Sequence, residues 1–225
     1  RGLGDVYKRQ EGDAAMTAKN YPEVVAKYSE YLKLTNYEDE SRVFNCAFAA
    51  YNAKKYDDAI KFYDMAIQKG YKTDDAYVGK AMSLRSQDKA ADFTATVEAG
   101  LKANAQNANL EKLLYAYCMK KGQAAQKAGK TEEAEELFKD VLVVGNAKYK
   151  GNALYSLGVM FYNAGAKILA DANPIATSDP DKYAAEKKKA DAQMAKAKGC
   201  LEQAIALNAA DANSKKILDA INAAK

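Results

Sequence analysis

The densest group of side chains that could do chemistry is Glu132–Glu136, where four of five residues are carboxylates. Carboxylates can bind a divalent cation or transfer protons. On a helix, however, consecutive side chains point about 100° apart around the axis, so these four do not converge on one ion. At the start of a helix they instead suit the positive end of the helix dipole. We therefore predict solvated carboxylates and no metal site.

Other catalytic residue types are missing or scattered. Histidine is absent, which removes the commonest general base and the commonest metal ligand. The three cysteines, Cys46, Cys118 and Cys200, are widely spaced among apolar or small residues. That pattern is typical of buried core positions rather than of disulfides or metal ligands. We predict that the protein is not an enzyme and has no catalytic residue, cofactor or metal.

The charge pattern argues against nucleic acid and membranes. The 34 basic and 30 acidic residues give a formal charge of +4, and only four of the basic residues are arginine, the type that grips phosphate in a bidentate way. The run Lys187–Lys189 offers charge to nucleic acid or lipid headgroups, but without interleaved aromatic residues it is typical of a solvated helix face. No stretch of about 18 apolar residues occurs. We predict no nucleic-acid partner and no membrane span in the chain.

The first ten residues differ in origin from the rest. Residues 1–10, RGLGDVYKRQ, resemble the in-frame translation of a sequencing adaptor, so we interpret them as an artefact that can extend the first helix. Without them, 31 basic residues face 29 acidic ones, a charge of +2. We expect the natural N-terminus to be missing, together with any signal peptide and any upstream repeats.

Composition and internal repetition both favour helices. Alanine fills 45 positions and proline only three. A polar turn opens a new helix at Tyr21 and again at Tyr56, a step of 35 residues. Later copies of the pattern occur at Gly129–Ala134 and at Leu154–Tyr162. Repetition at this period predicts stacked pairs of helices.

The second helix of each pair carries small and large residues on one face. Ala59, Tyr63 and Ala66 are four and three positions apart, so a neighbouring helix can approach the small residues while the ring fills the gap. The corresponding residues are Val24, Tyr28 and Tyr31; Phe93, Val97 and Gly100; Ala134, Phe138 and Val141; and Ala197, Leu201 and Ala204. Over nearly all of residues 5–211, this pattern resembles the tetratricopeptide repeat (TPR) family.

The resemblance implies an all-α fold, a TPR-like right-handed α-solenoid of about five helix pairs with a long insertion in the last repeat. We predict a single array over residues 11–225. Its repeats are expected at about 5–38, 40–73, 74–107, 108–148 and 151–211, followed by a capping helix at 213–223.

Two departures from the period predict long helices. The spacing between equivalent residues of successive repeats grows by seven between the third and fourth repeats. Residues Asn109–Lys127 should therefore form one over-long helix. In the last repeat, one helix should end near Ala172 and the next should begin near Asp181, with Asp179 as its N-cap and Pro180 at its first position. The result should be a projecting hairpin.

The end of the chain carries further packing signals. Gly151, Gly158 and Gly165 are seven residues apart and share one helix face, which predicts close helix packing there. The final helix places Ile217 and Ile221 on one side, which predicts that it covers the last open face of the array.

The family resemblance also implies a concave groove lined by the first helix of each pair. The residues expected there are Phe44, Phe48, Tyr51, Asn52, Val78, Met82, Arg85, Met119, Gln123, Tyr155, Val159, Tyr162 and Asn163. The triplet Tyr-Asn-Ala occurs at 51–53 and at 162–164, and its asparagine could hold a peptide backbone while its ring supplies apolar contact. Alternatively, these residues pack against neighbouring helices and fill the groove.

We therefore expect a non-enzymatic scaffold that binds a peptide or protein segment of unknown identity in its groove. Phe44 and Phe48 stand where TPR clamps for chaperone tails carry cationic and amide residues, so such a clamp is not predicted. The alternative is a structural or assembly component of a bacterial envelope complex that acts through its convex face or long hairpin. The resemblance places the protein in the periplasm or cell envelope, with the cytoplasm as the alternative.

Overall fold

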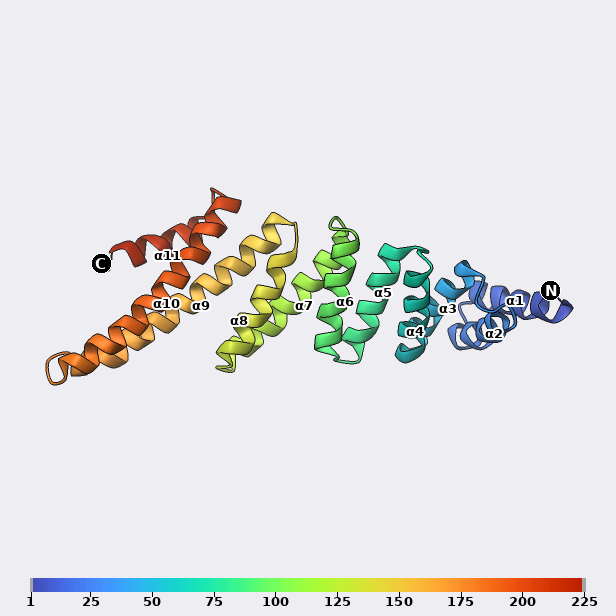
Figure 1. Ribbon diagram of the computed structural model, residues 1–225, viewed down its shortest axis with the longest axis horizontal. Helices are drawn as coiled ribbons and strands as arrows, with labels where there is room; N and C mark the ends of the chain where they lie inside the picture. The colour runs from blue at the N-terminus through green and yellow to red at the C-terminus, as the bar shows by residue number, and fades with distance from the viewer. Residues whose placement is uncertain (1, 224–225) are drawn as a thin grey trace. The chain divides into compact units, whose positions relative to one another are not determined.

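The computed structural model describes residues 2–223, and every regular element among them is a helix (Figure 1). Arg1, in the predicted adaptor segment, and Ala224–Lys225, at the end of the predicted array, lie outside the described residues. Successive helices are joined by short turns and pack against one another in pairs. The predicted all-α solenoid class is confirmed.

The described residues form two compact units, one up to Leu110 and one from Glu111 onward. The first unit contains α1 (Leu3–Thr17), α2 (Tyr21–Leu34), α3 (Glu40–Asn52), α4 (Tyr56–Gln68), α5 (Thr73–Ser86) and α6 (Ala90–Ala103). The unit boundary falls within α7 (Ala108–Lys127). The second unit contains α8 (Thr131–Asp140), α9 (Ala147–Ala172), α10 (Pro180–Leu207) and α11 (Ala212–Ala223). Short 3-10 turns occupy Val141–Val143 and Asn173–Ile175.

The predicted faces of the second helices form the core of the first unit. Tyr28, Tyr63 and Phe93 are at most 3% exposed. The ring of Tyr28 lies against Gly12 and that of Tyr63 lies against Gly79, so closely that a Cβ atom on either glycine would overlap the ring. Glycine on one helix therefore makes room for an aromatic side chain on an adjacent helix.

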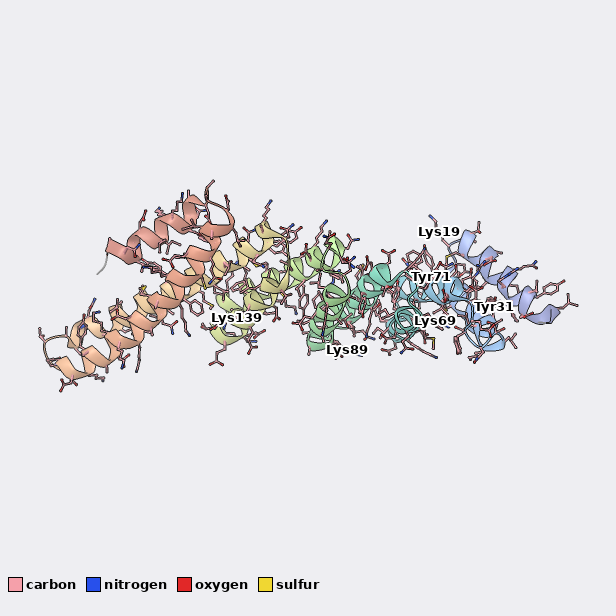
Figure 2. The ribbon with its side chains drawn as sticks, turned by 45° about the horizontal axis from the view of Figure 1, so that its top comes forward. Lys19, Tyr31, Lys69, Tyr71, Lys89 and Lys139 are labelled. Carbon is pink, nitrogen blue, oxygen red and sulfur yellow. The ribbon has the colours of Figure 1, made fainter. Side chains whose placement is uncertain are left out.

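The turn inside each of the first four pairs repeats one backbone geometry. Lys19, Lys54, Asp88 and Gly129 have left-handed φ angles between 55° and 74° (Lys19 is labelled in Figure 2). The amide after each donates to the carbonyl oxygen five residues earlier, at 2.8–3.0 Å. This Schellman arrangement ends the first helix of a pair and starts the turn. The steps between these residues are 35, 34 and 41, and the longer last step confirms the predicted lengthening of α7.

The long hairpin of α9 and α10 dominates the second unit (Figure 1). Asp179 accepts the amide of Lys182 at 3.1 Å, and α10 begins at Pro180, so the predicted N-cap is confirmed. Gly158 lies against Leu201 of α10, where an added Cβ would be 2.7 Å from Cγ. Gly151 has open space instead, so the prediction of close packing is wrong there, because Gly151 borders a hollow beside the end of α10.

The two ends of the described chain pack on their neighbours. Helix α1 begins inside the predicted adaptor segment, where Asp5 is 8% exposed and Lys8 Nζ lies 2.7 Å from Glu30 Oε2 of α2. At the other end, α11 contacts both α10 and α9, with Ile221 7% exposed. The predicted capping helix is therefore confirmed.

Candidate functional site

The predicted groove residues of the first unit are largely engaged with neighbouring side chains. Phe44 of α3 is half-buried, and its ring centroid lies 5.8 Å from that of Tyr63 and 6.2 Å from that of Tyr71, both edge-on. Lys72 Nζ lies 5.1 Å from the Phe44 centroid. Phe44 therefore packs against α4 and the turn that follows it, as in the alternative that the sequence left open.

The end of α3 keeps one exposed ring. Phe48 is 43% exposed and meets Tyr21 edge-on at 6.0 Å. Tyr51 is half-buried and tilts against Tyr56 at 5.8 Å. Asn52 is exposed, but its Nδ2 donates to the Phe48 carbonyl at 2.8 Å. Phe48 is therefore the one aromatic residue of this predicted set whose side chain is exposed.

Predicted residues on α5 and α7 differ widely in exposure. Val78 and Met82 are half-buried, whereas Arg85 and Gln123 are exposed. Met119 is only 9% exposed and offers little surface to a ligand, so its groove role stays a prediction.

Packing of α9 on α7 explains the burial of Met119. One turn before it, the ring of Tyr115 stacks on that of Tyr149 at 4.2 Å, and Asn152 Nδ2 donates to the Tyr115 hydroxyl at 2.8 Å. The face of α7 that Met119 shares with Tyr115 is therefore turned toward α9 rather than toward solvent.

Two predicted residues of the second unit, Tyr155 and Tyr162, line a connected series of hollows. A hollow of about 470 Å³ lies beside Tyr155 and the end of α10. A second, of about 370 Å³, lies between Tyr155, Tyr162 and α11, and a third, of about 580 Å³, continues from Tyr162 along the hairpin. Tyr155 and Asn213 border the first two, and Tyr162 and Ala220 border the last two. We call the whole series the α9–α11 trough.

The largest hollow of this trough, which we call the hairpin pocket, is lined by α9, α10 and α11. Its apolar lining includes Leu169 of α9, Met194 of α10 and Ile221 of α11. Val159, half-buried, and Asn163, exposed, lie on the same helix but border none of the three hollows. The structure therefore assigns Tyr155 and Tyr162 to the trough and leaves the role of Asn163 a prediction.

Basic side chains outnumber acidic ones along this trough. Its charged lining residues are Lys148, Lys187, Lys198, Lys216, Asp191 and Asp211, an excess of two positive charges. Lys187 pairs with Asp191 at 2.8 Å and Lys198 with Glu202 at 3.7 Å. The trough thus combines apolar and aromatic lining with a positive rim.

Sequence reasoning missed the contribution of α11 to this trough. Asn213, Lys216 and Ala220 line it, although the sequence predicted α11 only as a cover for the end of the array. The signal was weak because these side chains are small or polar. The apolar residue that the sequence did single out, Ile217, lines the trough as well.

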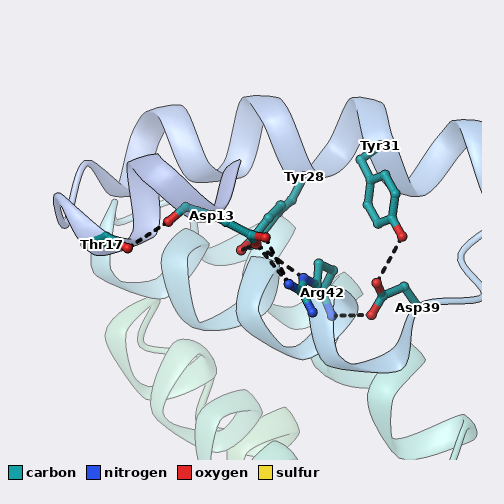
Figure 3. Close-up of polar contacts among 6 residues, drawn as sticks. All are labelled: Asp13, Thr17, Tyr28, Tyr31, Asp39 and Arg42. Atoms are coloured by element: carbon teal, nitrogen blue, oxygen red, sulfur yellow. Dashed lines mark hydrogen bonds and ion pairs between the residues drawn. The ribbon is translucent and has the colours of Figure 1, made fainter. Parts of the chain in front are cut away.

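A polar network in the first unit serves packing rather than ligand binding (Figure 3). Asp13 of α1 accepts two hydrogen bonds from Arg42 Nη2 of α3, at 3.0 and 3.1 Å, one from Arg42 Nε at 3.3 Å and one from the Tyr28 hydroxyl at 2.6 Å. Burial and the Asp13 carboxylate raise the pKa of Tyr28 above its usual value. Nearby, the Tyr31 hydroxyl donates to Asp39, the N-cap of α3, at 3.0 Å. These contacts tie α1, α2 and α3 together.

The first unit has a hollow of its own, a furrow of about 490 Å³ between α4, α5 and α6. Ion pairs span it, with Lys80 Nζ 2.7 Å from Asp64 and Lys89 Nζ 3.9 Å from Asp57. Its charges are therefore partly neutralised within the protein.

The described residues show no arrangement for metal or membrane chemistry. In residues 2–223, no three acidic or cysteine side chains gather as a metal site, and no helix is long and apolar enough to cross a membrane. Cys46 and Cys118 are free and buried, and burial raises the pKa of each thiol to about 12. They are poor nucleophiles.

Comparison with solved structures identifies the family. A TPR repeats protein from Bacteroides fragilis is 42% identical to this chain, with 100% of both chains covered and a TM-score of 0.92. A tetratricopeptide repeat protein from Parabacteroides merdae is 12% identical, over 99% of this chain and 86% of its own, with a TM-score of 0.43. The TPR2AB domain of yeast Sti1, solved in a complex with pHSP90, is 14% identical, over 96% of each chain, with a TM-score of 0.39.

Searches of family models and of curated proteins find no match. The full-length similarity to the Bacteroides fragilis protein agrees with the paired helices, the repeated turns and the small–large–small faces described above. This chain belongs to the tetratricopeptide repeat family.

Proposed function

We propose that the protein is a non-enzymatic scaffold that binds a segment of a partner protein along the α9–α11 trough. The observation that carries this proposal is the placement of Tyr155 and Tyr162, which border a connected hollow rather than packing into the core. Half-buried tyrosines suit binding surfaces because the ring supplies apolar contact and the hydroxyl supplies a hydrogen bond.

Site-specific photocrosslinking in the native cell tests this proposal. A photoreactive amino acid at Tyr162 should capture a partner protein, whereas the same amino acid at Glu132, exposed on α8 outside the trough, should not. Capture at Glu132 alone would contradict the proposal.

Affinity for the captured partner supplies the second measurement. Tyr155→Ala and Tyr162→Ala should each weaken binding by about tenfold or more, since aromatic anchors carry much of an interface's energy. Tyr183→Ala, which removes a half-buried tyrosine of α10 outside the trough, should leave affinity unchanged. The sequence prediction for the asparagines is tested separately with the same partner. A comparable loss in Asn52→Ala or Asn163→Ala would show that binding extends beyond the trough, and unchanged affinity with an intact fold would discard that prediction.

The alternative function is that of a structural or assembly component of a bacterial envelope complex that acts through its convex face or long hairpin. The furrow between α4, α5 and α6 offers such a component a hollow surface outside the trough. Under that function, crosslinks should arise from Asp92 in the furrow and not from Tyr162.

For the compartment, the family resemblance supports the periplasm or cell envelope. A signal peptide or lipobox in the complete gene would agree with it, and a cytosolic start would contradict it.

A further inference from the structure

The hairpin pocket is formed by two helix faces with identical spacing. From α9 and its C-cap it takes Tyr162, Ala166, Leu169, Ala170 and Asn173. From α10 it takes Lys187, Asp191, Met194, Ala195 and Lys198. Counted from its first residue, each set lies at positions i, i+4, i+7, i+8 and i+11. This spacing places each set on a single face of its helix. Two adjacent helices with such matched faces form a groove that a third helix can enter.

Helix α11 already occupies part of the same hairpin surface. It contacts α10 and α9, and its Ala220 and Ile221 form one end of the pocket. Toward its C-terminal end α11 diverges from the hairpin (Figure 1). Beyond it, no helix among the described residues covers the matched faces. The pocket therefore continues, on the same hairpin, a surface on which the protein already packs a helix.

The lining defines which helix would fit. The small side chains of Ala166, Ala170 and Ala195 leave room for larger apolar side chains of a ligand, with Leu169 and Met194 as partners. The faces extend over 11 residue steps, about 17 Å of helix.

Charge distinguishes between possible ligands. Lys187 and Lys198 flank the pocket, and each pairs with a carboxylate one turn away on α10, Asp191 at 2.8 Å and Glu202 at 3.7 Å. Pairs between exposed side chains are weak, so a ligand carboxylate can compete for these lysines. In the adjoining hollow, Lys216 is exposed and takes part in no ion pair described for residues 2–223. An acidic ligand would gain from these lysines, and a basic one would be repelled.

We propose that the hairpin pocket binds an acidic amphipathic α-helix of a partner protein, with apolar residues at positions i, i+4, i+7 and i+11. This inference rests on the proposed scaffold function and specifies the partner. The ligand helix lies along α9 and α10 beyond α11, and its acidic residues face the lysines of the rim.

A defined peptide tests the inference on the full chain. The probe is a labelled 14-residue peptide, stapled to hold the helix, with leucine at those four positions and glutamate or alanine elsewhere. Its counterpart carries lysine in place of glutamate. By fluorescence anisotropy, the glutamate peptide should bind at least about tenfold more tightly than the lysine peptide, and 0.5 M salt should weaken its binding.

Variants of the pocket supply the controls. Asp191→Lys should strengthen binding of the glutamate peptide, and Lys187→Glu should weaken it, each by severalfold. Lys188→Glu makes the same charge change at the next residue, which is exposed and does not line the pocket, and it should have little effect. Ala170→Trp places a large side chain in the pocket from an exposed position and should abolish binding.

The inference is overturned if the glutamate peptide does not bind, if both peptides bind equally, or if Ala170→Trp leaves binding unchanged. It is also overturned if an unstapled, proline-containing version of the glutamate peptide binds as well as the helical one, because the ligand would then be extended. Failure here with a partner still captured at Tyr162 would leave the scaffold function in place. Absence of any trough-bound partner would instead refute that function.

Discussion

At the scale of single residues, burial determines what the cysteine thiols can do. Cys46 and Cys118 are 0% exposed, as the sequence predicted, whereas Cys200 is half-buried. Burial raises the pKa of all three thiols. A thiol that stays protonated is a weak nucleophile and a weak metal ligand. The sulfur atoms of Cys46 and Cys118 therefore act as small apolar groups of the core.

The raised pKa values of Cys46 and Cys118 predict a loss of stability at alkaline pH. In the unfolded state these thiols ionise near pH 9, but in the folded state they ionise only near pH 12. Because the unfolded state loses its protons first, their contribution is complete below pH 9 and declines between pH 9 and 12. At pH 10 the loss should be about 1.4 kcal/mol per thiol. Urea unfolding at pH 8 and pH 10 measures it.

Single cysteine variants separate this effect from other titrations. Cys46→Ala and Cys118→Ala should each be less stable at pH 8, because each leaves a small cavity. In each variant, the free energy of unfolding should also fall less between pH 8 and pH 10 than in the unsubstituted chain. The difference should equal the contribution of the one thiol that was removed. An unchanged drop in both variants would assign the alkaline effect to other groups.

At the scale of helices, glycine sets how closely α9 and α10 pack. Gly158 faces Leu201 with no space for a Cβ, whereas Gly151, two turns earlier on the same helix, has no atom within 4 Å of that position. The two glycines share a residue type and a helix, and they differ in what packs against them.

These two positions predict opposite effects of the same substitution. Gly158→Ala should lower the free energy of unfolding by about 1–3 kcal/mol, because the added methyl group overpacks the contact with Leu201. Gly151→Ala should raise it by about 0.5–1 kcal/mol, because alanine has the higher helix propensity and no neighbour is disturbed. Urea unfolding at neutral pH compares the two, and effects of equal sign and size would show that α9 and α10 pack differently.

At the scale of the whole molecule, stability in a repeat protein is local, because each helix pair contacts only its neighbours. The described residues form two compact units, and in each unit glycines pack closely against large side chains of the same unit. A packing defect in one unit should therefore remain in that unit.

Hydrogen exchange of the whole chain tests this locality. Gly12→Ala, which crowds Tyr28, should speed amide exchange in α1 and α2, and Gly158→Ala should speed it in α9 and α10. Amides of the other unit should exchange at unchanged rates in each case. Uniform acceleration across residues 2–223 in either variant would show a single cooperative structure.

Much of the fold could be predicted from the sequence because its signals are local. The spacing of Ala59, Tyr63 and Ala66 identifies a buried helix face without reference to any distant residue, and all three are at most 3% exposed. Asp179 followed by Pro180 marks a helix start by the chemistry of the first turn alone. The order and pairing of the helices follow from such signals.

The candidate site could be predicted only in part, because exposure depends on what packs over a residue. Phe44 and Tyr155 occupy equivalent repeat positions, yet Phe44 is covered by Tyr63 and Tyr71 while Tyr155 borders a hollow. Met119 also occupies a groove position by its place in the repeat and is 9% exposed. Periodicity identifies the face of a helix, and the neighbouring elements decide whether that face stays open.

The sequence by itself thus determined the helix pairs, the long last hairpin and membership of the repeat family, since propensity, capping and periodicity act within one or two turns. Only the tertiary structure decided which helix faces stay open at the surface. The α9–α11 trough joins Tyr155 and Tyr162 to Lys216 and Ala220, more than 50 residues later in the chain. It stays open because α11 covers only part of the hairpin, an outcome of packing between distant elements that no local pattern encodes.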